Sequence, residues 1–168
     1  MSATPIWIAN DHGGVEMKRH FLARLDEKGL AYKNIGTDSP DIVRYPHYAA
    51  AVANAIVTGA ADRGILICST GIGMSIVANR FKGIRASVCT STYMGRMTRA
   101  HNDSNILCIG GMITGKLEAL DILDAWLDTP FEGGRHNISL GLLREAEDRL
   151  CVEGGLDPEV VWPAAERQ

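Results

Sequence analysis

Residues 64–79 constrain the fold of this 168-residue chain more than any other stretch, and they read GILICSTGIGMSIVAN. Residues 64–67 have the length and apolar composition of a strand buried on both faces. Cys68 follows, then a turn at residues 69–73 with two glycines that can adopt positive φ, and helical spacing resumes at residue 74. This order predicts a thiol at the carboxyl end of a central strand, beside the exposed amides of a helix N-terminus.

The predicted helix end suits an anion, because unpaired N–H groups and the helix dipole both favour negative charge. The same field favours the thiolate form of Cys68, which can act as a base or nucleophile. The alternative is that Cys68 is a small buried hydrophobe that ends a strand, since free cysteine is among the most buried residue types. The loop by itself leaves both interpretations open.

The composition fits one compact domain with a substantial core, since 46% of the residues are hydrophobic. A net charge of -3 argues against binding to nucleic acid or to a membrane surface. The four cysteines are widely spaced, with no CxxC pair and no His/Cys ligand cluster, so neither a zinc site nor a disulfide scaffold is indicated. Without a leader pattern or an apolar run of about 18 residues, we expect a cytoplasmic protein.

Strand-like and helical segments alternate along the chain. The predicted strands are 6–9, 30–35, 64–67, 84–89 and 106–109, and the predicted helices are 15–28, 48–58, 74–79, 92–100, 115–126 and 139–150. This alternation predicts an α/β fold, a three-layer doubly wound sheet of five parallel strands joined by right-handed crossovers. Residues 1–150 would form this single domain, with the last helix extending to a partner subunit, and residues 151–168 a tail of unknown role.

Ligands of such sheets bind outside the carboxyl ends of the strands. The polar residues expected at this edge are Asp11, His12, residues 68–73, Thr90 and Ser91.

Six blocks of sequence carry a more specific pattern. They are Asp11-His12, YPHYA at 45–49, the stretch 64–79, GIRA at 83–86, HNDSN at 101–105 and EGGRH at 132–136. Over about residues 5–150, in order and spacing, they resemble the type B ribose-5-phosphate isomerases and the related galactose-6-phosphate isomerase subunits. The resemblance implies an aldose–ketose isomerase that acts on a sugar phosphate without a metal ion or other cofactor, as a homodimer or a dimer of dimers.

The resemblance also implies catalytic roles. Cys68 would be the base that moves a proton between C2 and C1, Thr70 the hydroxyl that assists proton movement on oxygen, and His101 the residue that opens the sugar ring. Some relatives use a glutamate further along the loop, but this chain has Gly73-Met74-Ser75 there, which leaves the cysteine as the candidate. The amides that would hold the enediolate oxygen are those of Ser69, Thr70, Gly71, Ile72 and Gly73.

The implied substrate-binding residues lie in other blocks. Asp11 and His12 would bind the hydroxyls or the phosphate, and Tyr45 would close over the substrate. Asn102 matches a substrate-contacting amide, and Arg135 matches a phosphate-binding arginine whose guanidinium suits a dianion. Asp11 could instead only cap the following helix.

The predicted topology separates two of the catalytic residues. His101 precedes the fifth strand and so lies at the amino edge of the sheet, whereas Cys68 lies at the carboxyl edge. We therefore expect a neighbouring chain to supply the histidine, which implies a shared active site and an obligate homodimer.

Two positions depart from the family pattern. Met112 and Ser139 stand where relatives that bind ribose 5-phosphate usually carry arginines. Arg99, His136 or Lys116 are the candidates to supply the missing charge. Otherwise the substrate is a shorter, longer, differently phosphorylated or unphosphorylated sugar.

Three other functions compete with isomerisation. A small tyrosine phosphatase would need an arginine where this chain has Met74. A nucleotide-binding domain would need a P-loop lysine or a full GxGxxG motif, which the glycine loop lacks. The third alternative is a relative that binds a sugar phosphate without reacting, although Cys68, Thr70 and His101 are all present.

Overall fold

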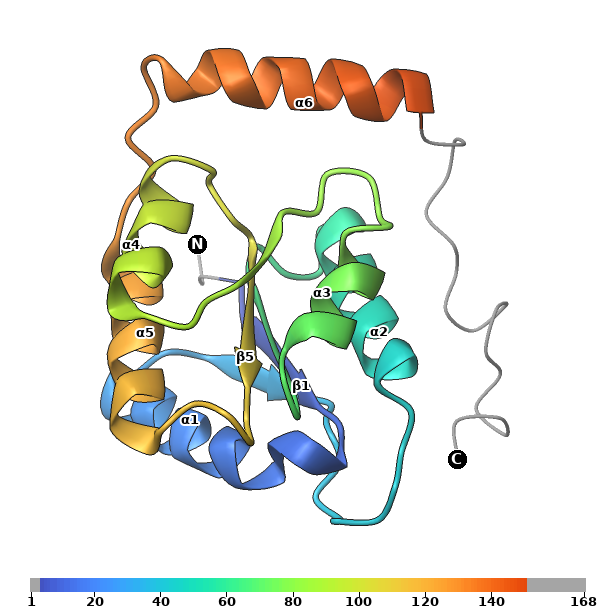
Figure 1. Cartoon of the computed structure of the whole chain (residues 1–168), viewed down its shortest axis with the longest axis vertical. Coiled ribbons are helices and arrows are strands. Elements are labelled where there is room, and N and C mark those ends of the chain that lie inside the picture. The colour runs from blue at the N-terminus through green and yellow to red at the C-terminus, as the bar shows by residue number, and fades with distance from the viewer. Residues whose placement is uncertain (1–3, 151–168) are drawn as a thin grey trace.

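One sheet of five parallel strands organises the structure, in the order β2-β1-β3-β5-β4 (Figure 1). The strands are β1 (Ile6–Asn10), β2 (Tyr32–Asn34), β3 (Gly64–Cys68), β4 (Ala86–Val88) and β5 (Ile106–Gly110). Every residue of β3 and β5 is buried, as the apolar composition of residues 64–67 predicted for the third strand. The computed structural model describes residues 4–150, so the predicted tail 151–168 lies outside the described residues.

Helices cover both faces of this sheet. They are α1 (Val15–Glu27), α2 (Tyr45–Val57), α3 (Ile72–Ala78), α4 (Thr92–Ala100), α5 (Lys116–Asp128) and α6 (His136–Leu150), with a 3-10 turn, η1 (His12–Gly14), before α1. In Figure 1, α2 and α3 lie on one side of the strands, and α1, α4 and α5 lie on the other. The predicted three-layer α/β fold is confirmed.

The core consists of two apolar clusters, one on each face of the sheet. Side chains of β3 alternate between them, because successive residues of a strand point to opposite faces. Ile65 and Ile67 belong to the cluster under α1 and α5, whereas Leu66 and Cys68 belong to the cluster under α2 and α3. The alternation directs the Cys68 side chain toward the layer that contains α3.

Several elements begin or end away from their predicted bounds. α2 begins at Tyr45 instead of residue 48, because Pro46 fits the first turn of a helix, where its missing N–H has no partner to lose. α3 begins at Ile72 and α6 at His136, two and three residues earlier than predicted. β2 and β4 have only three residues each, since they are edge strands that pair on one side.

α6 lies across the amino end of the sheet, above the rest of the domain in Figure 1. Near the end of α6, Glu147 accepts the N–H of Gly83, which precedes β4, and Asp148 pairs with Lys82 at 2.5 Å. Leu140 is buried against the domain, whereas Ile138 and Leu142 are 69% and 60% exposed. Within residues 4–150, no helix is both long enough and apolar enough to cross a membrane.

Candidate active site

Cys68 ends β3 directly beneath the glycine loop. Its side chain is only 5% exposed and packs among apolar residues, yet its Sγ accepts the backbone N–H of Gly71 at 3.1 Å. Both interpretations of this cysteine therefore describe part of its environment. It is a buried strand residue, and it also bonds to the amide of the loop that was predicted to bind an anion.

The loop takes its shape from Gly71, which has a φ of 78° and precedes the first residue of α3. A Cβ atom at this position would lie 3.0 Å from the carbonyl carbon of Ile109 in β5. Only glycine combines this left-handed conformation with such close contact to the neighbouring strand. Gly71, the N-cap residue of α3, makes no side-chain cap bond, so the Gly73 amide in the first turn has no bond from the cap residue.

Neighbouring backbone holds the loop from the β5 side. Gly111 donates its N–H to the carbonyl of Cys68 at 2.7 Å, and Met112 donates to the carbonyl of Ser69 at 3.1 Å. The hydroxyl of Thr70 accepts the N–H of Ile72 at 3.4 Å. Met112, which replaces an expected arginine, is thus attached to the loop and is itself 72% exposed.

Tyr45 lies over the same loop. A Cβ atom at Gly73 would be 2.9 Å from the Tyr45 ring, so the ring packs directly on the glycine backbone. The Tyr45 side chain stays 38% exposed. The structure thereby brings Tyr45 together with the loop after β3, as the predicted site requires.

Asp11 and His12 follow β1, the strand next to β3. They reach the loop through Gly13, where a Cβ atom would be 2.3 Å from Oγ of Ser69. The Asp11 carboxylate accepts the N–H of Gly13 at 2.9 Å and caps η1, so the alternative role predicted for it is present. Burial raises the pKa of the Asp11 carboxyl, and the Gly13 N–H opposes this shift.

Lys18 in α1 is buried, although a lysine on a helix usually faces solvent. Its side chain has no exposed surface, and its Nζ donates to the carbonyl of Thr37 at 2.7 Å and to Asp38 at 2.6 Å. These bonds fasten the loop between β2 and α2, and Val43 in that loop donates to Nδ1 of His12 at 3.4 Å. Nothing in the local sequence marks Lys18, because its partners lie about 20 residues away.

His101 is at the opposite edge of the sheet. It caps the C-terminus of α4, and Asn105 in the same block accepts the N–H of Gly64, the first residue of β3. β3 has five residues, so about 13 Å separate Gly64 at that end from Cys68 at the other. Asn102 and Arg135 are exposed near His101, so the predicted residues form two groups that this chain does not bring together.

The His101 group includes a possible set of metal ligands. His101, Glu132 and His136 each place one donor atom within 4.8 Å of the others. The two imidazole rings are stacked with centroids 4.1 Å apart and planes only 13° from parallel. Their in-plane lone pairs cannot converge on one ion at the usual distance of about 2.0–2.1 Å in this arrangement. We therefore assign no metal to the group.

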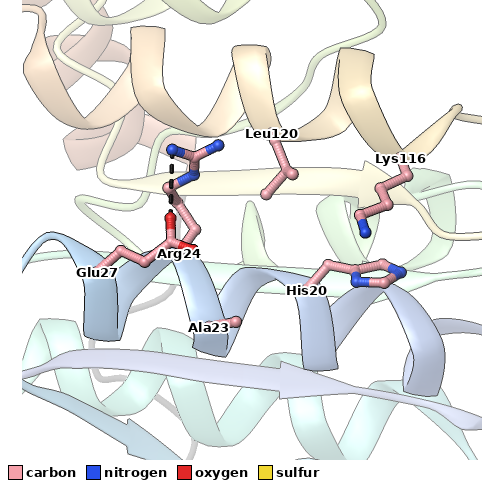
Figure 2. Close-up of a pocket in the computed structure, with 6 residues that line it drawn as sticks. All are labelled: His20, Ala23, Arg24, Glu27, Lys116 and Leu120. Carbon is pink, nitrogen blue, oxygen red and sulfur yellow. Dashed lines mark ion pairs between the residues drawn. The ribbon is translucent and has the colours of Figure 1, made fainter.

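Two of the proposed substitutes for the missing arginines lie elsewhere. Arg99 is 6% exposed, and its Nη1 donates to Asp103 at 2.8 Å and to the carbonyl of Ser104 at 2.6 Å. Lys116 points toward His20 across a small groove between α1 and α5, and Figure 2 shows the two side chains together. Arg99 is thus buried within the domain, and Lys116 lines a separate hollow.

Comparisons with known proteins agree on one family. Residues 6–142 match the family described as Ribose/Galactose Isomerase. The chain is 45% identical to ribose-5-phosphate isomerase B of Escherichia coli over 139 residues, which are 83% of this chain and 93% of that protein. A putative sugar phosphate isomerase of Bacillus subtilis is also 45% identical, over 84% of this chain and 96% of its own.

Solved structures give the same result. Ribose-5-phosphate isomerase B of Clostridium thermocellum superposes with a TM-score of 0.84 and 46% identity, over 86% of this chain and 98% of that chain. The enzyme of Mycoplasma genitalium with bound ribulose-5-phosphate superposes with a TM-score of 0.82 and 33% identity, over 88% of this chain and 98% of that chain.

Proposed function

Because this chain belongs to the ribose/galactose isomerase family, we propose that it interconverts an aldose phosphate and a ketose phosphate by moving a proton between C2 and C1. The first substrate pair to test is ribose 5-phosphate and ribulose 5-phosphate, which the names of its relatives suggest. The reaction needs a carbon base, donors for the enediolate oxygen and a group that opens the sugar ring.

The position of Cys68 is the observation that carries this proposal. Its sulfur accepts an N–H bond from the glycine loop, which is the interaction a carbon base would use when it carries charge. In the proposed mechanism Cys68 takes the proton from C2 of the open-chain aldose and returns it to C1. The amides of residues 69–73 hold the oxygen of the cis-enediolate, and Thr70 moves protons between its oxygens.

Exchange of substrate hydrogen with deuterium oxide tests this role. We expect the wild-type protein to incorporate deuterium at the exchanged carbon and Cys68→Ala to incorporate none while it keeps its fold. Cys89→Ala is the matched control, because Cys89 is a second buried thiol that the mechanism does not use. A wild-type protein that labels no substrate would be a binding protein, and a Cys68→Ala variant that still turns over would refute the thiolate.

The substrate is proposed to lie between two groups of residues. Asp11, His12 and Tyr45 surround the loop in this chain. Asn102 and Arg135 stand with His101 at the other edge, and we infer that they reach the loop of a second subunit. The exposed apolar residues Ile138 and Leu142 of α6 support such a partner.

Complementation tests the shared site. Cys68→Ala and His101→Ala should each be inactive alone, but a mixed dimer would keep one site with both residues intact. After random reassociation, half of the dimers are mixed, so activity should return to about a quarter of the wild-type value. If mixing restores nothing although mixed dimers form, each chain would have to build its site alone.

The identity of the sugar depends on Met112 and Ser139. Arg99 is buried and its Nη1 is bonded to Asp103 and Ser104, which argues against it as the substitute. A panel of tetroses, pentoses and hexoses, with and without phosphate, would give the substrate from the ratio of kcat/KM values. We expect Met112→Arg to favour 5-phosphates, because a guanidinium would then stand beside the loop.

We place the enzyme in the cytoplasm and expect it to need no nucleic acid, membrane or cofactor. The three cysteines of the described residues are free thiols, which is typical of a reducing compartment. Cell fractionation checks this location.

A further inference from the structure

Three side chains meet where the loop after α5 passes the end of α4. The imidazoles of His101 and His136 are stacked with centroids 4.1 Å apart. One oxygen of Glu132 lies 3.9 Å from Nε2 of His101 and 3.6 Å from Nε2 of His136. His136 is largely covered, with 15% of its side chain exposed, whereas His101 keeps 37% exposed. The covered His136 ring and the Glu132 carboxylate thus support the His101 ring, which remains accessible.

The backbone of the loop sets this arrangement. Glu132 donates its N–H to the carbonyl of Ala100 at 3.0 Å, which ties the loop to the residue before His101. Gly133 and Gly134 have φ values of 64° and 55°, so two consecutive left-handed residues turn the chain back. His136 then begins α6 and returns over His101. The contacts of Glu132 and His136 with His101 therefore depend on one glycine turn, which links α6 to the end of α4.

Asp103, a second carboxylate near His101, is already engaged. Asp103 pairs with Arg85 at 3.0 Å and with Arg99 at 2.8 Å. Its carboxylate is therefore committed to two guanidinium groups. Glu132, which is 58% exposed, is the carboxylate that lies beside the two imidazoles.

We propose that Glu132 and His136 are positioning residues that orient the imidazole of His101 for opening of the sugar ring, an inference that rests on the proposed function. The stacked ring of His136 fixes the plane of His101. The carboxylate beside Nε2 favours a proton on that nitrogen and leaves Nδ1 to exchange a proton with the sugar.

Ring opening, the step that Glu132 and His136 would assist, conserves the atoms and electrons of the sugar. The bond between C1 and the ring oxygen breaks, and its electron pair stays on the ring oxygen, which takes up a proton. The hydroxyl on C1 loses its proton and becomes the aldehyde oxygen. His101 relays these protons, so the orientation of its ring controls ring opening but does not affect the later proton transfer at carbon.

A pair of substrates separates these steps. Ribose 5-phosphate is a closed furanose that must open before it reacts. Ribulose 5-phosphate cannot close a furanose ring, because its O5 carries the phosphate, so deuterium exchange at its C1 needs the carbon base but no ring opening. The ratio of the two rates therefore reports on His101 independently of Cys68.

Glu132→Gln keeps the size of the side chain and removes its charge. We expect it to slow conversion of ribose 5-phosphate about tenfold or more and to leave exchange at C1 of ribulose 5-phosphate within about twofold. His136→Ala should give the same selective loss by removing the stack, and His101→Ala a larger one. Asp121→Asn, an exposed carboxylate on α5, is the matched control and should change neither rate.

The outcomes separate the inference from the function on which it rests. If Glu132→Gln and His136→Ala match Asp121→Asn in both rates, the positioning role is wrong. Equal losses in both rates would also overturn it, since they would indicate general damage to the site. Should Glu132→Gln fail to fold in a thermal melt, His136→Ala decides the matter. A wild-type protein that catalyses neither reaction would refute ribose 5-phosphate and ribulose 5-phosphate as its substrate pair, the part of the proposed function on which this test rests.

Discussion

Cys68, Cys89 and Cys108 are all buried free thiols, but their sulfur atoms have different surroundings. Burial raises the pKa of Cys89 to about 12, and it raises the pKa of Cys108 well above its ordinary value. These two thiols stay neutral at physiological pH, and neutral thiols are poor nucleophiles. Cys68 instead accepts an N–H from the loop, so residue type alone does not determine which cysteine can act as a base.

Alkylation of the native protein with iodoacetamide near pH 8 should distinguish these thiols. We expect inactivation to follow labelling of Cys68 and to be slowed by substrate, while Cys89 and Cys108 react only after unfolding. Peptide mass spectrometry during the time course gives the order of labelling. Inactivation that follows modification of Cys89 or Cys108 would contradict this assignment.

Asp11→Asn should stabilise the protein near pH 7 while it impairs substrate binding. A raised pKa means that the folded protein binds the Asp11 proton more tightly than the unfolded chain does. The ordinary pKa of an aspartate is 3.8. As the pH rises from this value through the higher pKa of the folded protein, ionisation of Asp11 lowers the free energy of unfolding, and this loss persists at higher pH. Asparagine keeps the cap on Gly13 without the charge.

Thermal unfolding at several pH values checks the effect. The gain in stability of Asp11→Asn over the wild type should be present at pH 7 and should shrink toward pH 3.8 and below. Loss of a charged hydrogen-bond partner should raise KM by about tenfold. A variant with unchanged KM would show that Asp11 serves only as a cap.

Among the elements, the central strands were predictable and several of the site's contacts were not. The apolar composition of β3 and the turn at Gly71 place Cys68 correctly, because both depend on neighbouring residues. Lys18 was missed because a lysine on a helix usually faces water, and its partner Asp38 comes from a later loop. The stack of His101 on His136 could not be predicted either, since it depends on a distant glycine turn.

The turn before α3 supplies a prediction with a close control. Gly71 and Gly59 have similar φ values of 78° and 77°. A Cβ atom at Gly71 would contact β5, whereas a Cβ atom at Gly59 would have no other atom within 4 Å. Alanine at either site should cost about 1–2 kcal/mol for the left-handed conformation. Gly71→Ala should lose further stability and nearly all activity, because the loop must shift from Cys68.

Chemical denaturation and turnover assays on both variants measure these two effects. Gly59→Ala should retain wild-type kcat/KM despite its lower stability. If Gly71→Ala is as active as Gly59→Ala, then the shape of the loop does not matter to the reaction.

At the scale of the whole molecule, the predicted residues divide between two edges of the sheet. α6 lies at the same edge as His101 and exposes Leu142, and we propose it as the contact for a second chain. We expect Leu142→Glu to dissociate the proposed dimer and to abolish activity, although it alters none of the proposed catalytic residues. Leu117→Glu on α5 is the control, because Leu117 is 76% exposed away from α6.

Sedimentation velocity and activity measured at the same protein concentration check this expectation. A fully active monomeric Leu142→Glu variant would exclude a site shared between chains. A dimeric variant with normal activity would instead place the subunit interface on another surface.

The distance between Cys68 and His101 within one chain has a consequence for the cell. When every reaction centre requires two polypeptides, mass action governs how many centres exist. Well below the dissociation constant, halving the amount of chain lowers total turnover about fourfold. Under the proposed shared site, metabolic flux would then fall more steeply than gene expression.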